Sequence, residues 1–176
     1  MISRVVLTTY VYPTEDEEKV MKALENLFEM DLFEKVGEEK LGDVKRIEFE
    51  CRGPQARLSL GKIYELLREQ EILDAARRVL KEGVTAEGSI LFHLNKQAAF
   101  AKAVSFSEGG ESPLGPIVVE IFPENPDDVD KVIDWLAPET IDGKPIYEVK
   151  KPRVPKRTEE GEEVPLLRQG RWAFSP

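Results

Sequence analysis

The segment Phe92–Phe100, with the sequence FHLNKQAAF, decides how the fold of this chain is interpreted. Apolar and more polar residues alternate up to its third position, and this period of two is typical of a β-strand with one buried face. We therefore predict a strand over residues 88–94. The polar triplet at 95–97 ends that strand, and the two alanines and the phenylalanine that follow predict a return to the core, with a short helix over residues 98–103.

The rest of the chain alternates between strand-like and helix-like stretches. Alternating apolar residues predict strands over residues 5–12, 44–52, 104–106 and 117–122. Apolar residues spaced three and four apart predict helices over residues 14–28, 59–82 and 125–136, with a bend in the second near residues 69–71. The first strand is apolar on both faces, which predicts a central position in the sheet.

Short end signals predict where the helices begin. Thr14 and Glu17 read as a capping box, Ser59 as the cap of the second helix, and Asn125 as the cap of the third. The charged stretch over residues 29–43 contains two glycines and is interpreted as a loop.

The order of these elements predicts an α+β fold. We expect a two-layer α/β sandwich over residues 1–138, in which a mostly antiparallel sheet carries helices on one face. Residues 139–176 are charged and interrupted by prolines, so we expect a C-terminal extension without a core of its own. Its apolar end, at Trp172 and Phe174, suggests an anchor onto the body or onto a second copy.

Composition limits the environment of the protein. Hydrophobic residues make up 41% and charged residues 34%, as in a globular protein with a charged surface. The chain has no apolar run near the roughly 18 residues of a membrane span, no signal-peptide pattern and a single cysteine, so we expect a cytoplasmic protein with no membrane partner. Four glutamines and three asparagines beside many charges favour a heat-adapted source.

The net charge of −9 argues against a protein coated with basic residues. Residues 138–176 carry eight basic and seven acidic residues, so the acidic excess lies in residues 1–137. A nucleic-acid surface on the body must therefore be a local patch.

The first candidate site is the polar triplet of Asn95, Lys96 and Gln97. Free backbone N–H groups at a helix start, next to a lysine, predict a phosphate site. In the alternative interpretation Asn95 only caps the helix, Lys96 lies over Phe100, and Gln97 bonds a loop carbonyl.

Further basic residues extend the candidate set for RNA or phosphate. Arg52 and Arg57 flank a Gly-Pro turn, and Lys102 follows the short helix. The tail adds a basic run, which consists of Lys150, Lys151, Arg153, Lys156 and Arg157. The alternative is that all of these are ordinary surface charges, as we also interpret the helical Arg68, Arg77 and Arg78.

The sequence contains no catalytic motif, and we predict no catalytic residues, metal site or cofactor. His93 is the only histidine and Cys51 the only cysteine, so the usual zinc ligand sets cannot form. We interpret His93 as a hydrogen-bonded strand residue and Cys51 as a small core residue.

Four blocks of sequence carry a resemblance to a known family. They are Tyr12–Val20, Leu67–Arg77, Phe92–Phe100 and Leu114–Ile117. In this order they resemble an archaeal group, uncharacterised protein family 0201, over roughly residues 1–137. The resemblance implies an archaeal, cytoplasmic source and an α+β fold similar to the ribosomal large-subunit protein that holds 5S RNA. It implies no established activity.

Three functions remain open at this point. The first is a non-enzymatic module that binds structured RNA or the ribosome, the second a homodimeric structural or interaction protein, and the third a small enzyme with a phosphate-bearing ligand at residues 95–97. We favour the first, because of the fold resemblance and the basic residues named above.

Overall fold

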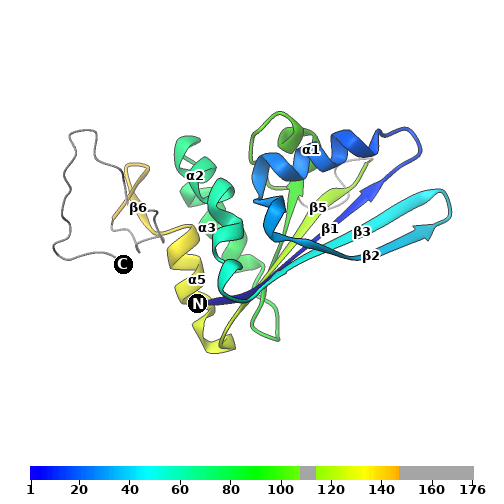
Figure 1. The fold of residues 1–176 in the computed structure, drawn as a ribbon. Helices are drawn as coiled ribbons and strands as arrows, with labels where there is room; N and C mark the ends of the chain where they lie inside the picture. The colour runs from blue at the N-terminus through cyan, green and yellow to red at the C-terminus, as the bar shows by residue number, and fades with distance from the viewer. Residues whose placement is uncertain (108–113, 147–176) are drawn as a thin grey trace, which may run out of the picture.

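The computed structural model describes residues 1–107 and 114–146 of the chain. Within these ranges a five-stranded antiparallel sheet, in the order β2-β3-β1-β5-β4, carries five helices on one face (Figure 1). The strands are β1 (Ile2–Val11), β2 (Glu34–Leu41), β3 (Val44–Arg52), β4 (Ile90–Asn95) and β5 (Pro116–Pro123). The helices are α1 (Glu17–Leu27), α2 (Gly61–Glu69), α3 (Leu73–Glu82), α4 (Lys96–Phe100) and α5 (Val129–Leu136). The predicted two-layer sandwich is confirmed, and a small hairpin of β6 (Thr140–Ile141) and β7 (Lys144–Pro145) follows it.

Strand β1 lies at the centre of the sheet, as predicted, and its alternation shows which face is covered. Val5 and Leu7 are fully buried under the helices, whereas Val6 and Thr8 on the opposite face are only half-buried. Strands β3, β4 and β5 repeat this pattern. One face of the sheet therefore forms the core, and none of the described helices covers the other face.

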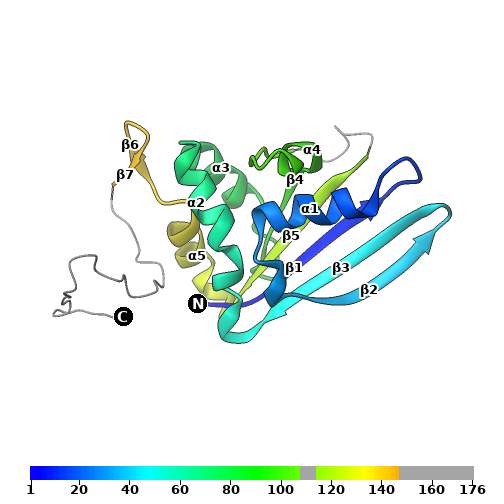
Figure 2. The ribbon, with the colours of Figure 1, turned by 45° about the horizontal axis from the view of Figure 1, so that its top comes forward.

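The helices form two groups on the covered face (Figure 2). Helix α1 runs along the sheet with α4 beside it, while α2, α3 and α5 lie together near the N-terminus (Figure 2). Helices α1 and α4 are therefore separate from the group of α2, α3 and α5. The contact between α1 and α4 lies at the edge of the core.

Two arginines attach α5 to the neighbouring helices. Arg68 donates to the carbonyl oxygens of Leu136 and Trp135 at 3.1 and 3.2 Å, and Arg77 donates to that of Ala137 at 3.0 Å. The last carbonyls of a helix lack partners within it and carry the negative end of its dipole. The interpretation of Arg68 and Arg77 as solvated charges was therefore wrong.

Strand β2 replaces the predicted loop over residues 29–43. It pairs with β3 from Glu34↔Glu50 to Leu41↔Val44, and a two-residue turn with Gly42 at φ 69° joins the two strands. Nearly every β2 residue is exposed, because an edge strand that extends beyond the helices has no buried face. Without such a face the strand leaves no hydrophobic alternation in the sequence.

The predicted helix caps differ from the observed ones in three places. Asn125 caps a 3-10 turn over Pro126–Asp128 by accepting from the Asp127 N–H at 3.0 Å, and α5 begins only at Val129. Asp16, not Thr14, caps α1 by accepting a hydrogen bond from the Glu18 N–H at 3.0 Å. Ser59 lies in a 3-10 turn, where its hydroxyl donates to the Ala56 carbonyl at 2.6 Å, and α2 begins at residue 61. Ser59 therefore bonds a carbonyl oxygen and not the helix N–H groups that the pattern assigned to it.

The bend predicted near residues 69–71 is confirmed. Helices α2 and α3 are separate, and between them Glu71 has a φ of 58°. Gly83 ends α3, also as predicted, and its own carbonyl accepts from the Leu91 N–H of β4 at 2.8 Å. None of the helices described is long and apolar enough to cross a membrane.

Candidate nucleic-acid interface

Helix α4 is short, and asparagine side chains close both of its ends. Asn95 accepts a hydrogen bond from the Ala98 N–H at 2.7 Å, so its predicted role as a cap is confirmed. At the other end Asn26 of α1 donates to the carbonyl oxygens of Ala99 and Phe100 at 3.0 and 3.1 Å. These contacts hold α4 against α1 in a defined position.

Lys96 is buried, with only 4% of its surface exposed. Its ammonium lies 3.0 and 3.2 Å from the two carboxylate oxygens of Glu15, and it donates to the carbonyl oxygens of Tyr10 and Leu114 at 2.6 and 2.8 Å. Burial lowers the pKa of Lys96, while the Glu15 carboxylate acts in the opposite direction. An ammonium has three N–H donors, so these partners leave none for a phosphate. Lys96 does not lie over Phe100, contrary to the alternative interpretation.

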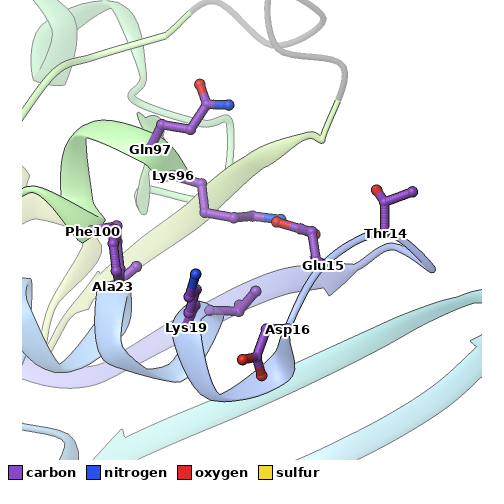
Figure 3. A pocket seen from close by; sticks show the side chains of 9 residues that line it. Thr14, Glu15, Asp16, Lys19, Ala23, Lys96, Gln97 and Phe100 are labelled. Carbon is purple, nitrogen blue, oxygen red and sulfur yellow. The ribbon is translucent and has the colours of Figure 1, made fainter.

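A groove of about 310 Å³ lies between the start of α1 and α4 (Figure 3). Figure 3 shows Lys96 reaching along it toward Glu15, with Lys19 and Phe100 on its walls. Phe100 is 47% exposed, so the predicted return to the core ends one residue earlier, at the fully buried Ala99. The groove therefore has a polar floor and an accessible aromatic ring.

Lys19 lines this groove, and two further lysines lie nearby in the sequence, Lys22 one turn along α1 and Lys102 two residues after Phe100. Lys19 and Lys22 are exposed on α1, and Lys102 is exposed just beyond α4. No ion pair of these three lysines is found in the described part of the chain. The Gln97 side chain is also exposed at the groove, and its amide forms no hydrogen bond with a described residue. Cations and an amide thus remain available to a ligand.

The uncovered face of the sheet is different, because its arginines are already paired. Arg4 and Arg52 both bond the Glu50 carboxylate at 2.9 Å, and Arg46 bonds Glu48 at 3.0 Å. Burial acts to raise the pKa of Glu50, but the hydrogen bonds from Arg4 and Arg52 outweigh it, and the pKa is lowered. A phosphate backbone would have to compete with these carboxylates, so the α1–α4 groove is the better candidate.

Comparison with known proteins places this chain in a family. A family model described as RNA binding matches residues 4–122. A protein of Methanopyrus kandleri called UPF0201 protein is 82% identical over 154 residues, which cover 88% of this chain and 96% of that protein. The chain belongs to the UPF0201 family. A UPF0201 protein of Thermococcus kodakarensis is 43% identical over 149 residues, 83% of this chain and 97% of that protein.

Solved UPF0201 structures have the same fold. The crystal structure of the UPF0201 protein from Methanococcus jannaschii matches with a TM-score of 0.69 at 37% identity, and the match covers 82% of this chain and 99% of that one. The predicted family and its archaeal relatives are thereby confirmed. The likeness to the ribosomal protein that holds 5S RNA stays a prediction.

The predicted site residues of this UPF0201 chain do not converge on one surface. Residues 95–97 and Lys102 lie at the end of β1 that contacts α4. Arg52, in contrast, lies opposite Arg4 in the β1–β3 register, near the start of β1. Six residues of β1 separate Arg4 from Tyr10, which is roughly 20 Å of strand. The basic tail run of residues 150–157, like Trp172 and Phe174, lies outside the described residues.

His93 and Cys51 lie where the sequence placed them. Cys51 is buried in β3, and burial raises the pKa of its thiol, which disfavours the reactive thiolate. His93 is half-buried on the uncovered face of the sheet. Among residues 1–107 and 114–146, no group of three or more His, Cys, Asp and Glu side chains could hold a metal ion.

Sequence reasoning missed the residues that give the groove and its surroundings positive charge and an exposed ring, namely Lys19, Lys22 and Phe100. A signal for the lysines was present, because Lys19, Lys22 and Asn26 are three and four residues apart and so share one helix face. No signal marked Phe100 as exposed, because its exposure depends on how α4 meets α1.

Proposed function

We propose that this protein is a non-enzymatic RNA-binding module that takes single-stranded RNA into the groove between α1 and α4. The observation that carries the proposal is the exposed Phe100 ring in a groove that is also lined by Lys19, which has no carboxylate partner among the described residues. The family model described as RNA binding spans both helices and supports it.

The chemistry of the groove suits an unpaired nucleotide. A nucleobase can stack on the face of Phe100, since every base has a π-face, and the free Gln97 amide can bond the edge of that base. The ammonium groups of Lys19, Lys22 and Lys102 would then meet the phosphates on either side. A duplex hides its base faces, so the groove favours single strands or loops.

The first test removes the aromatic ring. Fluorescence anisotropy with a labelled single-stranded RNA should show Phe100→Ala binding about 5- to 150-fold more weakly, the range expected for the loss of one base–aromatic stack. Phe100→Tyr should retain binding. Leu41→Ala is a matched control, because Leu41 is 48% exposed on β2, outside the groove. Equal affinity of Phe100→Ala and the wild type would refute this role of the ring.

The second test measures the electrostatic contribution. Three phosphate contacts to a single strand predict a slope of log affinity against log salt of roughly −2, so binding should weaken about 20-fold between 50 and 200 mM salt. Replacing Lys19, Lys22 and Lys102 together by Gln should bring the slope close to zero. Replacing the exposed Lys40 and Lys144 serves as the control, because it changes the overall charge away from the groove.

A comparison of RNA forms addresses the predicted partners. A hairpin and an unstructured strand of equal length distinguish structured from unpaired RNA, and purified ribosomal subunits test the ribosome. We expect the strand and the hairpin loop to compete for the groove, and a fully paired duplex not to compete. No binding of any RNA at 50 mM salt would overturn the proposal.

A further inference from the structure

A second cationic pocket lies at the opposite end of β1, around Arg57. The turn after β3 brings the Arg57 guanidinium over the indole ring of Trp135, with 5.5 Å from its central carbon to the ring centroid. Trp135 is only 1% exposed and stacks on Tyr64 at a centroid distance of 5.1 Å. The platform under the guanidinium is therefore fixed, and the cation is held in place before any ligand arrives.

The Arg57 guanidinium has no anionic partner in the part of the chain that the structure describes. No ion pair and no hydrogen bond is found for it there, although Arg4 and Arg77 each bond a carboxylate at 2.9 Å. Arg57 is half-buried, and this burial lowers its pKa. A partly desolvated cation without a partner is unfavourable, and a bound oxyanion would remove that penalty.

Arg57 lines a cavity of about 300 Å³. The other lining residues are apolar apart from one ion pair, in which the Met1 ammonium lies 2.8 Å from the Glu124 carboxylate. The volume is at the lower end of the range for small-ligand sites, so it suits a phosphate with one attached sugar-sized group. Pro54 and the 48% exposed Leu58 supply the apolar surface for such a group.

We infer that Arg57 and this cavity form an oxyanion site that takes the phosphate of a phosphomonoester, either a free nucleotide or the terminal phosphate of an RNA strand. The planar fork of an arginine donates two parallel hydrogen bonds to such a group. The RNA source of the phosphate rests on the proposed function, whereas the free nucleotide does not.

Trp135 provides a direct readout in the full-length chain. The sequence contains two tryptophans, so Trp172→Phe isolates the fluorescence of Trp135. Titration with adenosine monophosphate, inorganic phosphate, adenosine and acetate should change that fluorescence for the two phosphates only. Arg57→Gln should weaken phosphate binding about tenfold or more, and Arg57→Lys by less, because lysine keeps the charge without the fork. Arg78→Gln, on the exposed surface of α3, is the control and should bind as the parent does.

Each outcome bears on the inference. No response to either phosphate, or equal responses of the parent and both Arg57 variants, would overturn the site. Acetate binding as tightly as phosphate would overturn the assignment of the ligand. If a 5′-phosphate tightens RNA binding and Arg57→Gln removes that gain, the RNA terminus is the source. If adenosine monophosphate binds while the RNA phosphate has no effect, the free nucleotide is the source, and this result stands even if the groove binds no RNA.

Discussion

Replacing Lys96 by Met should destabilise the protein strongly, because it leaves a buried carboxylate without its cation. Two unit charges 3.0 Å apart, as in the Lys96–Glu15 pair, attract by roughly 5.5 kcal/mol at an effective dielectric constant of about 20, before desolvation is subtracted. Removing one partner of a buried pair costs about 3–5 kcal/mol. Glu15 still accepts from the Tyr12 N–H at 3.0 Å, so we expect a loss near the lower figure, about 3 kcal/mol.

Guanidinium unfolding, followed by circular dichroism, measures this loss directly. Lys102→Met is the matched control, since Lys102 is exposed, and it should change the free energy of unfolding by less than about 0.5 kcal/mol. Adding Glu15→Gln to Lys96→Met removes the orphaned charge and should recover part of the stability. A Lys96→Met protein as stable as the control would show that the buried Lys96–Glu15 pair does not stabilise the fold.

The same lysine predicts a pH effect. Because the pKa of Lys96 is lowered in the folded chain, the unfolded chain binds more protons between that lowered value and about 10.5. The contribution of Lys96 to stability therefore rises with pH across this window. Thermal unfolding between pH 8 and 10 should show a smaller upward trend in Lys96→Met than in the wild type, and identical trends would contradict the assignment.

Three further substitutions test the packing and the charges. The hydroxyl of Thr9 is buried without a hydrogen-bond partner, so Thr9→Val should stabilise the protein by about 1 kcal/mol in the same unfolding assay, and a loss would count against this reading. A Cβ at Gly83 would lie 2.1 Å from the Leu91 carbonyl oxygen, so Gly83→Ala should cost about 1–3 kcal/mol, whereas Gly61→Ala, with open space around it, should cost nothing. The lowered pKa of Glu50 contributes stability at neutral pH that is lost as the pH falls through that value, so Glu50→Gln should flatten the stability profile below about pH 5; an unchanged profile would show that Glu50 is not its source.

Local periodicity explains why much of the fold was predictable. The alternation in β1, β3, β4 and β5 reports a sheet with one buried face, and the helical stripes report the layer above it. Asn95 and Asn125 were identified as caps because a cap bonds an N–H only two or three residues away. Such signals lie within a short window of sequence, so they can be recognised without knowledge of the tertiary structure.

The candidate site depended on contacts that no short window contains. Lys96 is paired because Glu15, 81 residues earlier in the chain, lies beside it, and Arg57 is positioned by Trp135. Strand β2 is a strand only because β3 pairs with it, and Phe100 is exposed only because α4 ends against α1. Short-range patterns in the sequence are sufficient for four strands of the sheet, for the helices and for the family. Which cations are neutralised can be known only from the folded chain, because the charge of a surface depends on partners that folding brings together.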